Sequence, residues 1–270
     1  MSYTIIVIFY TSFEITTDHD IILPPFTSKL SRLILVKLSD TYSKLQYQNT
    51  SYKPLRVTVI KDPEGRPVYA RGRGKSIING NQSYSFTFSF QDENIFREIM
   101  EKVQTTVEAW NTKFQVNLKD IKVVDQTESL RSESKLYRME FLTPTLLQPI
   151  RPNLKRKDNR FVLFPYVPIL LFSIVKHWNQ NMDQKIHGVT GLKTLYYMRE
   201  VDYRLRPVTT YYDGKPVRGF TGWTVFELRS KRNSKITRNV QKLLEYANYF
   251  GVGKSRAIGF GEVNVKVIDE

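Results

Sequence analysis

The order of hydrophobic patterns repeats once along the chain, and this repeat limits the folds that the sequence can adopt. Each half contains alternating, strand-like segments and segments with apolar residues at helical spacing. In the first half the predicted strands are 3–9, 55–61, 83–90 and 114–124, and the predicted helices are 26–38 and 92–110. In the second half the strands are 135–142, 196–211, 215–228 and 257–268, and the helices are 167–180 and 233–250. Both orders are βαββαβ, which predicts an α+β chain of two tandem ferredoxin-like domains, 1–126 and 127–270.

Two local features support these strands. Asp213-Gly214 separates the last two predicted strands before the C-terminal helix, and this dipeptide is a strong signal for a type I′ hairpin turn. Residues 83–90 alternate with period two, which places a row of aromatic side chains on one face. That row is Tyr84, Phe86, Phe88 and Phe90. We expect these rings to lie in the core rather than to form a platform for stacking bases.

The charge balance favours a polyanionic partner. The chain has 41 Lys and Arg against 26 Asp and Glu, a formal net charge of +15, which is typical of proteins that bind nucleic acid or an acidic membrane surface. Three segments are basic: 71–75, 151–160 and 215–256, the last with ten cations against two acids. Any one of them is also explained by solubility alone.

Several classes of protein are disfavoured by what the sequence lacks. It has no cysteine, which excludes disulfides and thiolate metal sites, and its three histidines, His19, His177 and His187, lack ligand spacing. We therefore expect no metal and no cofactor. The N-terminus lacks the features of a signal peptide, and the longest apolar run, FVLFPYVPILLFSIV, is too short for a membrane helix. These features predict a soluble, cytoplasmic protein without a membrane partner.

The glycine-rich loop FGVGKSRAIGFG (residues 250–261) contains a GKS triplet but does not fit a nucleotide-binding loop. A Walker A loop needs glycine five residues before Gly253, where this chain has Asn248, and it connects a strand to a helix rather than a helix to a strand. Two interpretations stay open. The glycines could allow the backbone to approach phosphate groups, with Lys254, Ser255 and Arg256 as partners. Alternatively, Gly251 ends a helix and Gly259 and Gly261 form a bulged strand.

The predicted domains and this loop together resemble the RAMP superfamily of CRISPR-associated proteins. Within it, the chain most resembles the endoribonuclease that cuts CRISPR repeat transcripts into guide RNAs. The segments LPPFTSKLSRLIL (23–35), FPYVPILLFSIVKHWN (164–179) and VRGFTGWTVFEL (217–228) are similar to segments of archaeal members. The resemblance implies that CRISPR repeat RNA (pre-crRNA) is the partner. It also implies metal-independent cleavage by a 2′-hydroxyl, giving a 2′,3′-cyclic phosphate and a 5′-hydroxyl.

The candidate catalytic residues depart from the family pattern. Many members use a histidine between the first helix and the second strand, but this chain has no histidine between residues 26 and 61. By its spacing Tyr47 falls near the histidine position, and Lys53 matches the family lysine before the second strand. Lys29, with Arg32 one turn further along the helix, can point into the same cleft. The sequence thus predicts a lysine-based site, completed by Arg232, with solvated surface charge as the alternative for each residue.

The predicted RNA-binding residues come from the basic segments and the glycine-rich loop. They are Arg71, Arg73, Lys231, Lys235, Arg238, Lys242, Gly251, Gly253, Lys254, Ser255 and Arg256. Two other functions stay open. One is a non-catalytic RAMP subunit that binds guide RNA in a CRISPR effector complex, and the other is an unrelated basic RNA-binding protein of the same fold. Effector-complex subunits and a second copy of the chain are further candidate partners.

Overall fold

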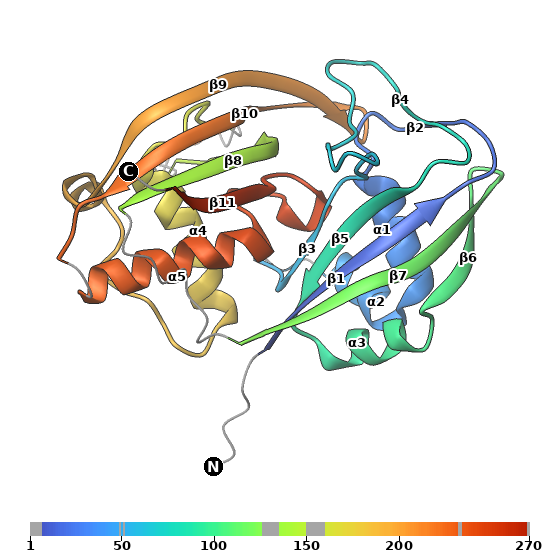
Figure 1. The fold of residues 1–270 in the computed structure, drawn as a ribbon, viewed down its shortest axis with the longest axis horizontal. Coiled ribbons are helices and arrows are strands. Elements are labelled where there is room, and N and C mark those ends of the chain that lie inside the picture. Colours follow the sequence, from blue (N-terminus) through green and yellow to red (C-terminus); the bar gives the residue numbers. More distant parts are fainter. Residues whose placement is uncertain are drawn as a thin grey trace, which may run out of the picture. The chain divides into compact units, whose positions relative to one another are not determined.

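The computed structural model describes residues 7–48, 50, 52–125, 135–149, 160–231 and 234–268. The chain forms two compact units (Figure 1). Unit 1 comprises Met1–Asp125, Thr210–Val217 and Ala257–Gly259, and unit 2 comprises Gln126–Thr209, Arg218–Arg256 and Phe260–Glu270. Two short segments from the second half of the sequence therefore belong to unit 1.

Unit 1 is built on a five-stranded antiparallel sheet. Its strands, in spatial order, are β3 (Leu55–Val57), β5 (Tyr84–Phe90), β1 (Val7–Thr16), β7 (Thr112–Asp125) and β6 (Gln104–Ala109). The first four have the strand order of a ferredoxin-like domain, and β6 extends the edge. The helices are α1 (Ser28–Leu38), α2 (Asp40–Tyr47) and α3 (Glu93–Met100), and α1 and α2 lie behind the sheet in Figure 1. A separate pair, β2 (Ile21–Leu23) and β4 (Ser76–Ile78), was not predicted.

The aromatic row of β5 lies in the core of unit 1, as predicted. Phe86, Phe88 and Phe90 are fully buried, and the Phe86 ring stacks on Phe13 of the neighbouring strand with 4.8 Å between ring centroids. The apolar face of α1 packs against the same core. These contacts fix α1 on the sheet and thereby set the positions of the polar residues on its other face.

The prediction of one helix over 92–110 was wrong. Asp92 caps the N-terminus of helix α3, because its carboxylate accepts from the amide of Asn94 at 2.8 Å, but the helix ends at Met100. Strand β6 follows and pairs with β7 through a turn at Trp110 and Asn111, both with positive φ. The β-branched run at 105–107 favours a strand, and the apolar spacing of the segment did not distinguish the two structures.

Unit 2 has the βαββαβ order predicted for the second half. Its sheet has the spatial order β11 (Val263–Ile268), β8 (Leu136–Thr145), β10 (Lys215–Leu228) and β9 (Met198–Tyr212). The helices are α4 (Val167–Asn181) and α5 (Lys235–Phe250), and the 3-10 helices are η1 (Leu192–Tyr196) and η2 (Arg256–Ile258). None of the helices in the described part of the chain is long and apolar enough to cross a membrane.

Two details of unit 2 concern the predicted turns. Asp213 and Gly214 both have positive φ, 49° and 72°, which is the backbone of the predicted type I′ turn between β9 and β10. The last strand was predicted from residue 257 but begins at Val263, because η2 and a turn occupy the intervening residues. Gly259 and Gly261 therefore lie before the strand and form no bulge within it.

Candidate functional site

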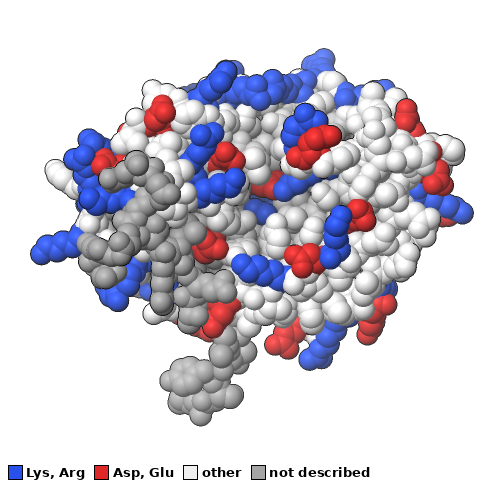
Figure 2. Space-filling model, viewed as in Figure 1, with Lys and Arg blue, Asp and Glu red and all other residues white. Residues whose placement is uncertain are grey.

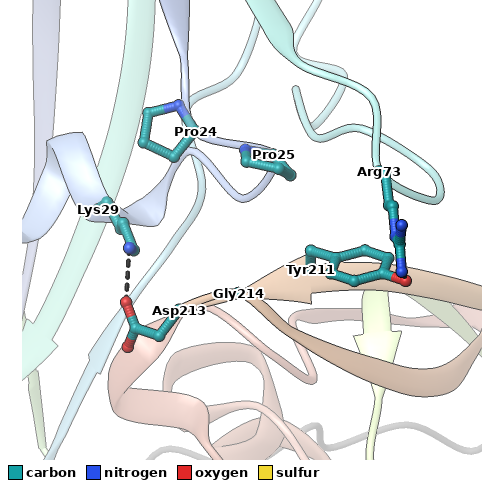
Figure 3. A pocket seen from close by; sticks show the side chains of 7 residues that line it. All are labelled: Pro24, Pro25, Lys29, Arg73, Tyr211, Asp213 and Gly214. Atoms are coloured by element: carbon teal, nitrogen blue, oxygen red, sulfur yellow. Dashed lines mark hydrogen bonds and ion pairs between the residues drawn. The ribbon is translucent and has the colours of Figure 1, made fainter.

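The polar face of α1 meets the tip of the β9–β10 hairpin within unit 1. The Lys29 ammonium lies 2.5 Å from the Asp213 carboxylate and 5.5 Å from the centre of the Tyr212 ring. Figure 3 shows the Lys29–Asp213 ion pair directly. Ser28 donates to the backbone carbonyl of Ile258 at 2.7 Å, which places part of the glycine-rich loop beside the start of the helix. Three segments that are distant in the sequence thus converge around Lys29.

Arg32 connects this cluster to the second candidate lysine. Its guanidinium donates to the Tyr212 hydroxyl and, at 3.1 Å, to the side-chain oxygen of Gln46 on α2. The backbone carbonyl of Gln46 accepts from the Lys53 ammonium at 2.6 Å. The structure therefore links Lys29 and Lys53 through Tyr212, Arg32 and Gln46, and we call these five residues the lysine network.

Burial and neighbouring charge alter the acid–base properties of the lysine network. Partial burial, and then the positive charge of Arg32, hold the pKa of Lys53 below its ordinary value. Burial raises the pKa of Tyr212, and Arg32 partly offsets this effect. A lysine with a lowered pKa is neutral in a larger fraction of molecules near pH 7, which suits proton transfer, while its charged form still attracts phosphate.

The other two candidate catalytic residues have different surroundings. Tyr47 is the last residue of α2, next to Gln46, and 80% of its surface is exposed. Its hydroxyl is therefore accessible to a substrate at the edge of the lysine network. Arg232 lies outside the described residues, and its neighbour Lys231 is exposed.

None of the three histidines is a member of the lysine network. His177 is buried in α4, where its Nδ1 lies 2.6 Å from the Tyr246 hydroxyl and its ring packs on Phe250. His19 and His187 are exposed. Within the described residues, no cluster of three or more His, Asp or Glu side chains is arranged to hold a metal ion.

The glycines of the glycine-rich loop are required by close packing of the backbone. Gly251 ends α5, and its amide donates to the Ala247 carbonyl at 2.7 Å, as the helix-end interpretation predicted. A Cβ at Gly253 would lie 2.6 Å from the carbonyl oxygen of Leu146, and one at Gly261 would lie 1.9 Å from that of Val252. Both also have positive φ. Around Gly253 and Gly261 the loop therefore packs closely against backbone of unit 2.

The three polar residues predicted to bind phosphate in the loop differ in their exposure. Arg256 is buried, and it donates to the backbone carbonyls of Gly253 at 2.9 Å and Ser173 at 2.8 Å. Lys254 and Ser255 are exposed. The sequence alone gave these three residues one role, because nothing in their order indicates that Arg256 turns inward.

Most of the predicted RNA-binding cations lie on the surface. Lys235 and Arg238 are exposed on α5, whereas Lys242 is half-buried and donates to Gln184 at 3.2 Å. Arg71 and Arg73 are exposed in the loop before β4, and the predicted segment 151–160 lies, except for Arg160, outside the described residues. Figure 2 shows further cations along β9 and β10. The cations of β9 lie outside the three basic segments predicted from the sequence. Those exposed on β9 are Arg199, Arg204 and Arg206.

Comparison with known families identifies the relatives of this chain. The family "Cas6 N-terminal domain" matches residues 9–124, and the family "CRISPR-associated endoribonuclease Cas6" matches residues 139–263. The chain belongs to the Cas6 family. This confirms the resemblance to RAMP-type repeat-processing endoribonucleases that the sequence motifs indicated. The two Cas6 matches together span both halves of the chain, as expected of a two-domain Cas6 protein.

Individual Cas6 proteins match over nearly their whole length. Two Saccharolobus solfataricus proteins, CRISPR-associated endoribonucleases Cas6 1 and Cas6 2, are 26% and 24% identical in sequence to this chain. The first alignment covers 97% of both proteins, and the second covers 96% of both. The structure of Thermus thermophilus Cas6 superposes with a TM-score of 0.66 at 15% identity, covering 96% of this chain and 98% of that one. The structural match supports the tandem ferredoxin-like fold.

Proposed function

We propose that this Cas6 protein cleaves CRISPR repeat RNA without a metal ion, through the lysine network. A 2′-hydroxyl attacks the adjacent phosphorus, the bond from phosphorus to the 5′ oxygen breaks, and the products carry a 2′,3′-cyclic phosphate and a 5′-hydroxyl. The observation that carries the proposal is the linkage of Lys29 and Lys53 through Tyr212, Arg32 and Gln46 in a chain that lacks the usual histidine. The names of the Saccharolobus relatives support endoribonuclease activity.

The lysine network meets the chemical needs of this reaction. The 2′ proton must be removed, the extra negative charge at phosphorus must be stabilised, and the 5′ oxygen must receive a proton. Lys53, with its lowered pKa, is the proposed proton-transfer group. Lys29 is the proposed phosphate partner, because a phosphate oxygen can take the place that the Asp213 carboxylate holds in this structure. Arg32 adds positive charge at the centre of the network.

Tyr47 completes the part of the proposed site that lies in unit 1. The exposed phenol of Tyr47 can donate a hydrogen bond to the substrate from the end of α2. Arg232 lies outside the described residues and stays a predicted catalytic residue. Lys231, just before it in sequence, is exposed and is a candidate to bind the RNA backbone next to the cleaved bond.

The proposed RNA-binding surface follows from which cations are exposed. Lys235, Arg238 and Lys254 are exposed and suited to phosphate contacts, and Ser255 can add a hydrogen bond. In the glycine-rich loop the glycines and Arg256 hold the backbone in shape, so their contribution to RNA binding is indirect. Arg71, Arg73 and Lys242 extend the set. Two further interactions remain predictions: transfer of the product to effector-complex subunits, and formation of a homodimer.

The proposal is tested with a 5′-labelled CRISPR repeat RNA in EDTA, beside a copy with one 2′-deoxy nucleotide at the cut. We expect cleavage of the first RNA at one position and no cleavage of the second, because the attacking oxygen is missing. Cleavage of the deoxy copy, or activity only with added magnesium, would contradict the proposed chemistry. Tight binding without cleavage of either RNA would instead favour a subunit that only holds guide RNA.

A further inference from the structure

A pocket of about 310 Å³ lies beside Lys29 within unit 1 (Figure 3). Its volume falls within the ~300–1,000 Å³ that is usual for small-ligand sites. Its lining combines apolar and aromatic side chains with charged ones. Its lining residues are Pro24, Pro25, Lys29, Arg73, Tyr211, Asp213 and Gly214. Lys29 belongs to the lysine network and Asp213 is its ion-pair partner, but neither Tyr211 nor Arg73 has a role in that network.

Strand alternation explains why Tyr211 faces this pocket. Thr210 is buried and donates to the Ala70 carbonyl at 2.8 Å, and the Tyr212 ring packs edge-on against Phe26 at 6.1 Å between centroids. Since successive side chains of a strand point to opposite faces, Tyr211 points away from the core that its two neighbours contact. The neighbours thus hold the backbone in place, and the Tyr211 ring is presented on a fixed support.

The chemistry of the pocket matches an unpaired nucleotide. Arg73 donates to the Tyr211 hydroxyl at 3.1 Å, and its guanidinium carbon lies 5.6 Å from the centre of the ring. Proteins recognise unpaired RNA bases by stacking them on aromatic rings and guanidinium planes, and they hold the adjacent phosphates with Lys and Arg. Pro24 and Pro25 supply a second apolar wall.

We propose that this pocket binds one unpaired nucleotide of the RNA, with its base on the Tyr211 ring and its phosphate on Arg73. The inference rests on the proposed function, because the RNA is the repeat RNA whose scissile phosphate Lys29 contacts. The nucleotide therefore lies close to the cleaved bond. Tyr211 is a binding residue in this account and takes no part in bond breaking.

The test asks whether the Tyr211 ring and the base at one RNA position contribute to the same binding interaction. Equilibrium binding is measured for repeat RNAs with a 2′-deoxy at the cut and with each nucleotide in turn made abasic. The wild type should lose affinity at one unpaired position by roughly 5- to 150-fold, the equivalent of ~1–3 kcal/mol per stacked base. Tyr211→Ala should weaken binding of the intact RNA by a similar factor. For this variant, removing the base at that same position should reduce the affinity little further.

Three controls accompany the scan. Tyr211→Phe keeps the ring and should bind like the wild type, and Tyr211→Leu keeps apolar bulk without stacking in case the alanine variant folds poorly. Tyr196→Ala removes a tyrosine of unit 2 that is 90% exposed and should preserve the wild-type pattern. The pocket assignment would be overturned if Tyr211→Ala or Tyr211→Leu bound the intact RNA with wild-type affinity. It would also be overturned if, at every abasic position, the affinity loss from the Tyr211 substitution and the loss from the missing base were additive.

The cleavage assay keeps this result separate from the proposed function. If the wild type cuts the repeat in EDTA but shows no coupling to Tyr211, the pocket assignment fails and the proposed activity stands. If coupling is found without cleavage, the nucleotide pocket stands and the proposed activity fails.

Discussion

The Arg256→Met variant separates the structural role of the glycine-rich loop from a role in RNA binding. Arg256 is 5% exposed, and its guanidinium donates to two backbone carbonyls, those of Gly253 and Ser173. Hydrogen bonds that involve a charged group contribute about 1.5–3 kcal/mol each. Methionine also avoids the cost of burying the guanidinium, which offsets part of this loss. The expected net loss of stability is therefore about 2–4 kcal/mol.

The assay compares Arg256→Met with Lys254→Met by thermal unfolding and by RNA binding. A loss of that size should lower the melting temperature of Arg256→Met by roughly 5–15 °C. Lys254 is exposed, so Lys254→Met should unfold like the wild type and instead bind RNA more weakly. An Arg256→Met protein with wild-type thermal stability and weakened RNA binding would refute the reasoning, because Arg256 would then act on the RNA and not on the loop.

Three further predictions concern the site, the loop and the surface. Arg32→Gln removes a positive charge that lowers the pKa of Lys53, so the rise of cleavage rate with pH should move to higher pH; an unchanged pH–rate profile would exclude this role. Gly261→Ala should unfold at a lower temperature than Gly188→Ala, since both glycines have positive φ but only Gly261 meets backbone within 4 Å. Arg238→Gln should reduce the slope of log Kd against log salt by about 0.7–1 per lost phosphate contact, and an unchanged slope would remove Arg238 from the interface.

The elements that could be predicted from the sequence are those whose partners lie nearby in the chain. The alternation of β5 and the Asp213-Gly214 turn each follow from short-range physics, namely period-two burial and positive φ. Helix α2 was missed because its stretch is short and polar, with Tyr42 its only fully buried residue. The segment after Met100 was misassigned because its apolar residues fit both a helix and a strand.

The candidate site was predictable in its residue types but not in its connections. The polar side of the first helix indicated Lys29, and the resemblance to repeat-processing endoribonucleases indicated Lys53. The role of Tyr212 depends on the tip of a hairpin that belongs to unit 1 although it is about 180 residues away in sequence from Arg32. No local pattern encodes such a long-range contact. The burial of Arg256 has the same origin, since its partner Ser173 lies on α4.

The most direct test of the lysine network is the single-turnover cleavage rate, in EDTA, of Lys29→Met and Lys53→Met beside Lys44→Met. Lys44 is an exposed lysine of α2 outside the network and serves as the matched control. The account predicts that Lys53→Met slows cleavage about 10²–10⁴-fold, as expected for loss of a proton-transfer group, and that RNA affinity changes little. Lys29→Met should also cut slowly, and Lys44→Met should cut at the wild-type rate. Cleavage at the wild-type rate by Lys29→Met and Lys53→Met would contradict the account and place the chemistry elsewhere in the molecule.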